Sequence, residues 1–129
     1  YRNPIDVIFG RLITQGKPNS PHLRHIMCDE NIKLEDVVIK KSDLYKLEEF
    51  YDNYTSLNNI KNYNIYCVKY ELFFNNIDIF NKILEIPDIK SLYPVKIERK
   101  KKKYYIKQLT EIYKSLIVKM NKMPFILKI

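Results

Sequence analysis

The sequence of 129 residues contains no alanine, only two glycines and only two cysteines. Gly10 and Gly16 do not form a glycine-rich phosphate loop of the GxxxxGK type, which excludes that kind of nucleotide site within residues 1–129. Cys28 and Cys67 are too few for a disulfide framework, so we expect reduced thiols. No apolar stretch approaches the roughly 20 residues that span a membrane, and no signal-peptide pattern is present. The sequence therefore predicts a soluble protein, with the cytoplasm as its default compartment.

Hydrophobic residues make up 46% of the chain and aromatic residues 13%, so residues 1–129 can bury the core of a single domain. The formal net charge is +8, and residues 96–129 carry the surplus, with 11 basic against 2 acidic side chains. Because alanine is absent while lysine and asparagine are abundant, the composition itself is biased. The lysine count is therefore weak evidence of a nucleic-acid partner, and we expect no specific nucleic acid to bind.

The first residues have the pattern of a capped helix. Asn3 can cap the free amides, Pro4 suits the first helical position, and Asp6 falls in the first turn. Apolar residues follow at the spacing of one buried helix face, namely Ile5, Ile8, Phe9, Leu12 and Ile13. Residues 15–21 contain glycine, two prolines, asparagine and serine, which predicts a loop.

Three further helices and one strand are predicted along the rest of the chain. Ser42 is a candidate cap for the next helix, and Asn76 caps another that Pro87 ends. The clearest helical stripe is continuous over residues 104–123. Residues 65–70 form a β-branched and aromatic run whose near-continuous apolarity is typical of an interior parallel strand. A helix followed by a buried strand indicates an α/β layer arrangement.

Arg2 immediately precedes the first predicted helix. If a strand leads into that helix, the arginine stands at the strand end beside unpaired helix amides, where an anion is favoured. The planar guanidinium matches the oxygens of a phosphate or carboxylate. The alternative is that Arg2 forms a local ion pair ahead of an ordinary capped helix.

Two motifs resemble a known family. The segment RNPIDVI at residues 2–8 resembles the RNPxDxx motif of sulfotransferases that use 3′-phosphoadenosine 5′-phosphosulfate (PAPS). The segment VKYE at residues 68–71 is similar to the family's V-[RK]-Y-E-D-L strand end. A helix follows this strand end in the family, and its pattern is matched here by Ile79, Ile83 and Leu84.

The resemblance implies the C-terminal part of a P-loop-like sulfotransferase fold, in which helices flank a parallel central sheet. It implies sulfuryl transfer from PAPS to a hydroxyl acceptor, a sugar or another small molecule, without a metal. On this resemblance Arg2 binds the 3′-phosphate and Tyr70 contacts the adenine. Arg99 and Lys100 match the first two letters of an R-K-G signature that also holds the 3′-phosphate, and Lys101 replaces its glycine.

The sequence also departs from the family pattern. Gly10 stands where the family usually has a serine that contacts the 3′-phosphate, and Leu72 replaces the usual acidic residue after Glu71. The phosphosulfate loop and the catalytic residues are expected before Tyr1. We therefore expect a fragment that is inactive by itself.

Two other features have alternative interpretations. His22, His25 and Cys28 have the spacing H-x2-H-x2-C, but a structural zinc site needs a fourth ligand, so surface or loop positions are expected instead. The basic run at residues 99–103 precedes Tyr104 and could contact phosphates and stack bases. The alternative function is therefore a small basic nucleic-acid-binding or protein-interaction module without catalysis.

Overall fold

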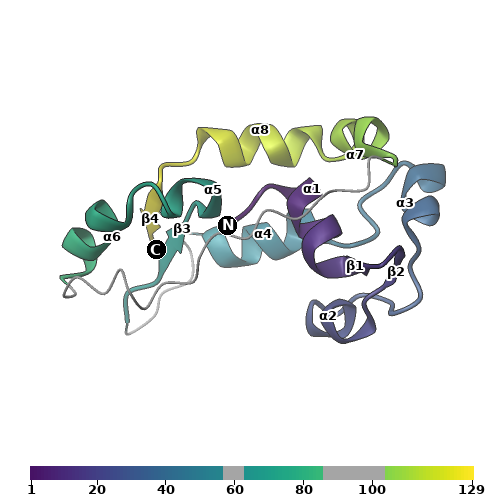
Figure 1. Ribbon diagram of the computed structural model, residues 1–129, viewed down its shortest axis with the longest axis horizontal. Coiled ribbons are helices and arrows are strands. Elements are labelled where there is room, and N and C mark those ends of the chain that lie inside the picture. Colours follow the sequence, from purple (N-terminus) through teal and green to yellow (C-terminus); the bar gives the residue numbers. More distant parts are fainter. Residues whose placement is uncertain (57–62, 86–103) are drawn as a thin grey trace.

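The computed structural model describes residues 1–56, 63–85 and 104–129. In chain order its elements are α1 (Pro4–Val7), the π-helical turn η1 (Ile8–Leu12), β1 (Ile13–Thr14), β2 (Lys17–Pro18), α2 (Ser20–His25), α3 (Leu34–Lys40), α4 (Leu47–Thr55), β3 (Tyr66–Val68), α5 (Tyr70–Phe73), α6 (Ile77–Leu84), α7 (Ile106–Ile112), α8 (Lys114–Lys122) and β4 (Ile126–Lys128). Helices α4 and α8 follow the long axis of the molecule, with β3, β4 and α6 toward one end and α2 and α3 toward the other (Figure 1). Among the described residues, none of the helices has the length and apolarity that crossing a bilayer requires.

The predicted start of the first helix is confirmed. The side-chain oxygen of Asn3 accepts a hydrogen bond from the backbone N–H of Ile5 at 2.9 Å, and Pro4 is the first residue of α1. The loop predicted over residues 15–21 is interrupted by regular structure. It contains the turn between β1 and β2, in which Gln15 and Gly16 both have positive φ, and α2 already begins within it. A two-residue turn of this kind matches the twist of an antiparallel pair.

The helix predicted to follow Ser42 is α4, which begins later than expected, at Leu47. The capping oxygen comes from Asp43, whose Oδ2 accepts from the backbone N–H of Glu48 at 2.8 Å. Lys46, immediately before the helix, has a left-handed backbone with φ of 52°, so the chain turns there rather than continuing as a helix. Ser42 is therefore not the cap.

The continuous helix predicted over residues 104–123 is divided into α7 and α8. Tyr113 lies at the break, with φ of −96° and ψ of 14°. The predicted apolar stripe is nevertheless buried, since Leu109, Tyr113, Leu116 and Met120 all belong to the core. The predicted helix after Asn76 is confirmed as α6, but the Asn76 side chain makes no capping hydrogen bond to it. Pro87 lies outside the described residues.

The predicted α/β fold with a parallel central sheet flanked by helices is wrong. The described residues form two small antiparallel sheets, β1 with β2 and β3 with β4. The predicted interior strand is present as β3, but it pairs with the C-terminal β4, and its residues are only half-buried. An apolar run indicates that a strand exists, whereas the direction of its partner depends on distant parts of the chain.

A hydrophobic core between the helices holds the molecule together. Its buried side chains come from α1, η1, β1, α2, α3, α4, α7 and α8, from the segments after α2 and before α4, and from Tyr113 between α7 and α8. The largest fully buried side chains are Tyr45, Tyr113, Ile8, Leu12, Leu23 and Leu109. The core therefore fixes α1 against the C-terminal helices and leaves the preceding residues beside β3.

Candidate functional site

The segments that carry Arg2 and Tyr70 are joined through their backbones. The N–H of Tyr70 donates to the carbonyl oxygen of Tyr1 at 2.8 Å, and the amino group of Tyr1 donates to the carbonyl oxygen of Val68. In a parallel β pair, the N–H and C=O of one residue bond to the two residues that flank its neighbour on the other strand. Tyr1 bonds in this way to Val68 and Tyr70, which flank Lys69. This pairing brings the start of the chain to the end of β3 (Figure 1).

Arg2 and Tyr70 are in direct contact. The guanidinium carbon of Arg2 lies 4.4 Å from the centroid of the Tyr70 ring, within the range of a cation–π interaction. The Nε of Arg2 is buried and has no hydrogen-bond partner among the described residues. Gly10 lies alongside, because a Cβ placed there would be 3.7 Å from Nη1 of Arg2. The Nε of Arg2 is therefore an unused donor, and Nη1 of the same guanidinium faces a position without a side chain.

An aromatic cluster supports the Tyr70 ring. The ring of Phe74 meets Tyr70 edge to face, with centroids 5.4 Å apart and an interplanar angle of 86°. Phe73 makes similar edge-to-face contacts with Phe74 and with Phe80 of α6. Such contacts favour one orientation of each ring. Tyr70 is therefore held between Arg2 and Phe74, the residue that follows α5, and Phe73 and Phe80 extend the cluster.

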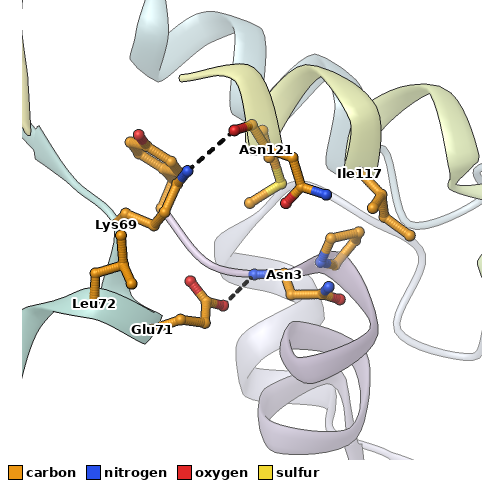
Figure 2. Close-up of a pocket in the computed structure, with 9 residues that line it drawn as sticks. Asn3, Lys69, Glu71, Leu72, Ile117 and Asn121 are labelled. Atoms are coloured by element: carbon orange, nitrogen blue, oxygen red, sulfur yellow. Dashed lines mark hydrogen bonds between the residues drawn. The ribbon is translucent and has the colours of Figure 1, made fainter. Parts of the chain in front are cut away.

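A pocket of about 290 Å³ is lined by the sequence neighbours of Arg2 and Tyr70 but not by that pair. Its lining residues are Tyr1, Asn3, Pro4, Lys69, Glu71, Leu72, Ile117, Met120 and Asn121. Figure 2 shows the Glu71 carboxylate pointing to the backbone nitrogen of Asn3, whose N–H donates to Oε1 of Glu71 at 2.6 Å. Neither Arg2 nor Tyr70 lines the pocket. Since neighbours in an extended segment point to opposite sides, the side chain of Arg2 leaves the chain on the side opposite to Tyr1 and Asn3, which line the pocket.

Two polar side chains in this pocket are engaged by the protein itself. The Nζ of Lys69 donates to the carbonyl oxygens of Met123 at 3.0 Å and Asn121 at 3.4 Å, at the carboxyl end of α8, where a cation is favoured. The Tyr1 hydroxyl donates to the carbonyl oxygen of Pro124. Burial raises the pKa of the Tyr1 phenol to about 12. This phenol is therefore a hydrogen-bond donor at neutral pH and not a base.

The residues of the H-x2-H-x2-C pattern do not form a cluster. His22 and His25 are exposed on α2, whereas Cys28 is buried and its thiol donates to the carbonyl oxygen of Tyr45 at 3.1 Å. Burial raises the pKa of the Cys28 thiol. In the part of the chain that the structure describes, no group of three histidine, cysteine or acidic residues could hold a metal ion. Cys28 is a core residue.

Comparisons with known proteins add no relative. No protein-family model matches the sequence, and no match was found among curated proteins or solved structures. The resemblance to sulfotransferases therefore rests on the motifs at residues 2–8 and 68–71.

The structure brings together two of the four residues predicted to bind the nucleotide. Arg2 and Tyr70 are in contact, whereas Arg99 and Lys100 lie outside the described residues. The sequence interpretation missed Phe74, although its spacing of four residues from Tyr70 is a signal for contact on a helical stretch. It also missed the pocket, whose walls come from three distant parts of the chain.

Proposed function

We propose that the Arg2–Tyr70 pair binds the adenosine 3′,5′-bisphosphate part of PAPS. In this proposal Arg2 holds the 3′-phosphate and Tyr70 contacts the adenine. The observation that carries it is the distance of 4.4 Å between the guanidinium and the ring. Two residues that lie far apart in the sequence, one from each motif, meet at one place.

The unpaired Nε of Arg2 supports an anionic ligand at this position. A buried donor without an acceptor costs about 1–3 kcal/mol, and a phosphate bound by Nε and one Nη would satisfy it. The guanidinium of Arg2 lies over the Tyr70 ring, so in this proposal the adenine packs against the part of the ring that Arg2 leaves uncovered. Stacking of a base on an aromatic side chain contributes about 1–3 kcal/mol.

In the proposed reaction, the chain supplies nucleotide recognition to a sulfotransferase-like transfer. The oxygen of the acceptor hydroxyl bonds to sulfur and gives up its proton to a base, while the bond from sulfur to the 5′-phosphate oxygen breaks and adenosine 3′,5′-bisphosphate leaves. Arg2 and Tyr70 act on the nucleotide and not on the sulfur. We assign neither His22 nor His25 as the base, because α2 lies toward the opposite end of the molecule from β3 (Figure 1).

Isothermal titration calorimetry with adenosine 3′,5′-bisphosphate and adenosine 5′-monophosphate tests the role of Arg2. Arg2→Ala should weaken bisphosphate binding by about 10- to 150-fold, the equivalent of about 1.5–3 kcal/mol for a charged hydrogen bond, and should leave monophosphate binding nearly unchanged. Arg11→Ala is the matched control, because Arg11 is an exposed arginine on η1. Equal affinity of the unsubstituted chain for the two nucleotides would refute the assignment of the 3′-phosphate.

The role of Tyr70 is tested with the same two nucleotides. Tyr70→Ala should weaken the binding of both, because both contain adenine, whereas Tyr70→Phe keeps the ring and should bind like the unsubstituted chain. Submicromolar binding of RNA or DNA oligonucleotides at physiological salt would instead favour a nucleic-acid-binding module. Such binding would weaken steeply as the salt concentration rises.

A further inference from the structure

We propose that Glu71 is a positioning residue that sets the Arg2–Tyr70 pair in its binding geometry, an inference that rests on the function proposed above. Oε1 of Glu71 accepts a hydrogen bond from the backbone N–H of Asn3 at 2.6 Å. Asn3 follows Arg2 in the sequence, and Glu71 follows Tyr70. This hydrogen bond therefore joins the two segments one residue after Arg2 and one residue after Tyr70.

Arg2 lies between two hydrogen bonds to the opposite segment. On one side, the N–H of Tyr70 donates to the carbonyl oxygen of Tyr1 at 2.8 Å, and on the other, Asn3 donates to Glu71. The backbone is therefore fixed at both neighbours of Arg2, which sets the direction in which its side chain leaves the chain. The first bond is between backbone groups, whereas the second depends on one carboxylate that mutation can remove.

Glu71 acts through the backbone and not on the ligand. It lines the pocket together with Asn3, and neither Arg2 nor Tyr70 is part of that lining (Figure 2). A carboxylate would also repel a phosphate. The backbone N–H of Asn3 needs only an acceptor oxygen at this position, which Oε1 of Glu71 supplies at 2.6 Å.

Three variants separate positioning from charge. Glu71→Ala removes the acceptor, and Glu71→Gln keeps an acceptor oxygen without the charge. Glu49→Ala removes an exposed carboxylate from α4 and is the charge-matched control. The first measurement is the NMR shift of the Arg2 side-chain protons without nucleotide, because the Tyr70 ring moves them upfield when the guanidinium lies over its face. The second is the ratio of the dissociation constants of adenosine 5′-monophosphate and adenosine 3′,5′-bisphosphate, measured by calorimetry.

Glu71→Ala should remove most of the upfield shift and lower the ratio by about tenfold, whereas Glu71→Gln and Glu49→Ala should keep both. An unchanged shift and ratio in Glu71→Ala would overturn the inference, and so would a loss in Glu71→Gln as large as that in Glu71→Ala. If Glu71→Ala does not fold, Glu71→Asp takes its place, since the shorter side chain withdraws the acceptor from Asn3, and an undiminished upfield shift there counts against positioning.

The NMR measurement also separates this inference from the proposed function. If the unsubstituted chain binds the two nucleotides equally, the proposed function fails and the role of Glu71 in nucleotide binding fails with it. If binding depends on Arg2 but neither the shift nor the ratio depends on Glu71, only the positioning role fails.

Discussion

Replacing Tyr113 with phenylalanine should lower the free energy of unfolding by about 2 kcal/mol at neutral pH. Tyr113 lies between α7 and α8, where it is 2% exposed, and its hydroxyl donates to Oδ1 of Asp43 at 2.8 Å. A hydrogen bond to a charged group contributes about 1.5–3 kcal/mol. The loss of free energy is expected in the lower part of this range because the Asp43 carboxylate is not left without a partner. Its Oδ2 still accepts a hydrogen bond from the backbone N–H of Glu48.

Tyr45 provides a matched control with the opposite expected sign. Its side chain is fully buried, and its hydroxyl has no hydrogen-bond partner among the described residues. Removing an unsatisfied buried hydroxyl relieves the cost of its desolvation, so Tyr45→Phe should be neutral or stabilising by up to about 1 kcal/mol. Both variants make the same chemical change in a buried site. The difference between them therefore isolates the hydrogen bond of Tyr113.

The two phenols also predict how stability changes at alkaline pH. Burial raises the pKa of Tyr113 and of Tyr45 above the ordinary value of about 10. The unfolded chain loses these protons first, so this contribution to stability is complete below pH 10 and is lost as the pH rises through the folded pKa. Each phenylalanine variant should therefore reduce the alkaline loss of stability by up to about 1.4 kcal/mol per pH unit.

Urea unfolding followed by circular dichroism at pH 7 and in steps above pH 10 measures these effects. A Tyr113→Phe variant that stays within about 0.5 kcal/mol of the unsubstituted chain at pH 7, the usual effect of a surface substitution, would show that the hydrogen bond from Tyr113 to Asp43 does not stabilise the fold. Equal destabilisation by Tyr45→Phe and Tyr113→Phe would contradict the difference expected from the hydrogen bond of Tyr113.

Two further predictions concern Gly10 and Cys28. A Cβ at Gly10 would be in ordinary contact, 3.7 Å from Nη1 of Arg2, so a serine fits there. Its hydroxyl adds a donor for the 3′-phosphate that the proposal places at Arg2, so calorimetry should show bisphosphate binding tightened by about three- to tenfold in Gly10→Ser. Gly10→Ala adds no donor and should leave this binding unchanged. Weaker binding by Gly10→Ser would contradict the placement of the 3′-phosphate. Because Cys28 is buried and its thiol pKa is raised, it should react with Ellman's reagent far more slowly in the folded chain than in urea, and a fast reaction in the folded chain would contradict its burial.

Local sequence signals predicted structure well where a cap and its helix are adjacent. Asn3 caps α1 as predicted, because the cap and the helix lie within one turn of each other. Helix α6 begins directly after Asn76 as predicted, but the Asn76 side chain does not cap it and donates to the carbonyl oxygen of Leu72 at 2.7 Å. The same reasoning failed at Ser42. There the neighbouring Asp43 has a carboxylate that accepts both from the start of α4 and from the hydroxyl of Tyr113, and the second contact has no local signal.

The two larger errors have causes beyond local sequence. No glycine or proline lies near Tyr113, so the division between α7 and α8 could not be read from the stripe of apolar residues. The apolar run at residues 65–70 predicted a strand, but its antiparallel partner is β4, a segment for which no strand was expected. Pairing direction depends on which distant segment reaches the strand, and periodicity does not contain that information.

Arg2 and Tyr70 meet even though the predicted sheet is wrong, and backbone register explains why. Tyr1 bonds to the residues on both sides of Lys69, which directs Arg2 to Tyr70 and leaves Asn3 on the pocket side. A shift of one residue would turn Arg2 into the pocket, because neighbours in an extended segment face opposite sides. The contact between the two motifs therefore depends on a few hydrogen bonds at the start of the chain, and it does not require a parallel central sheet.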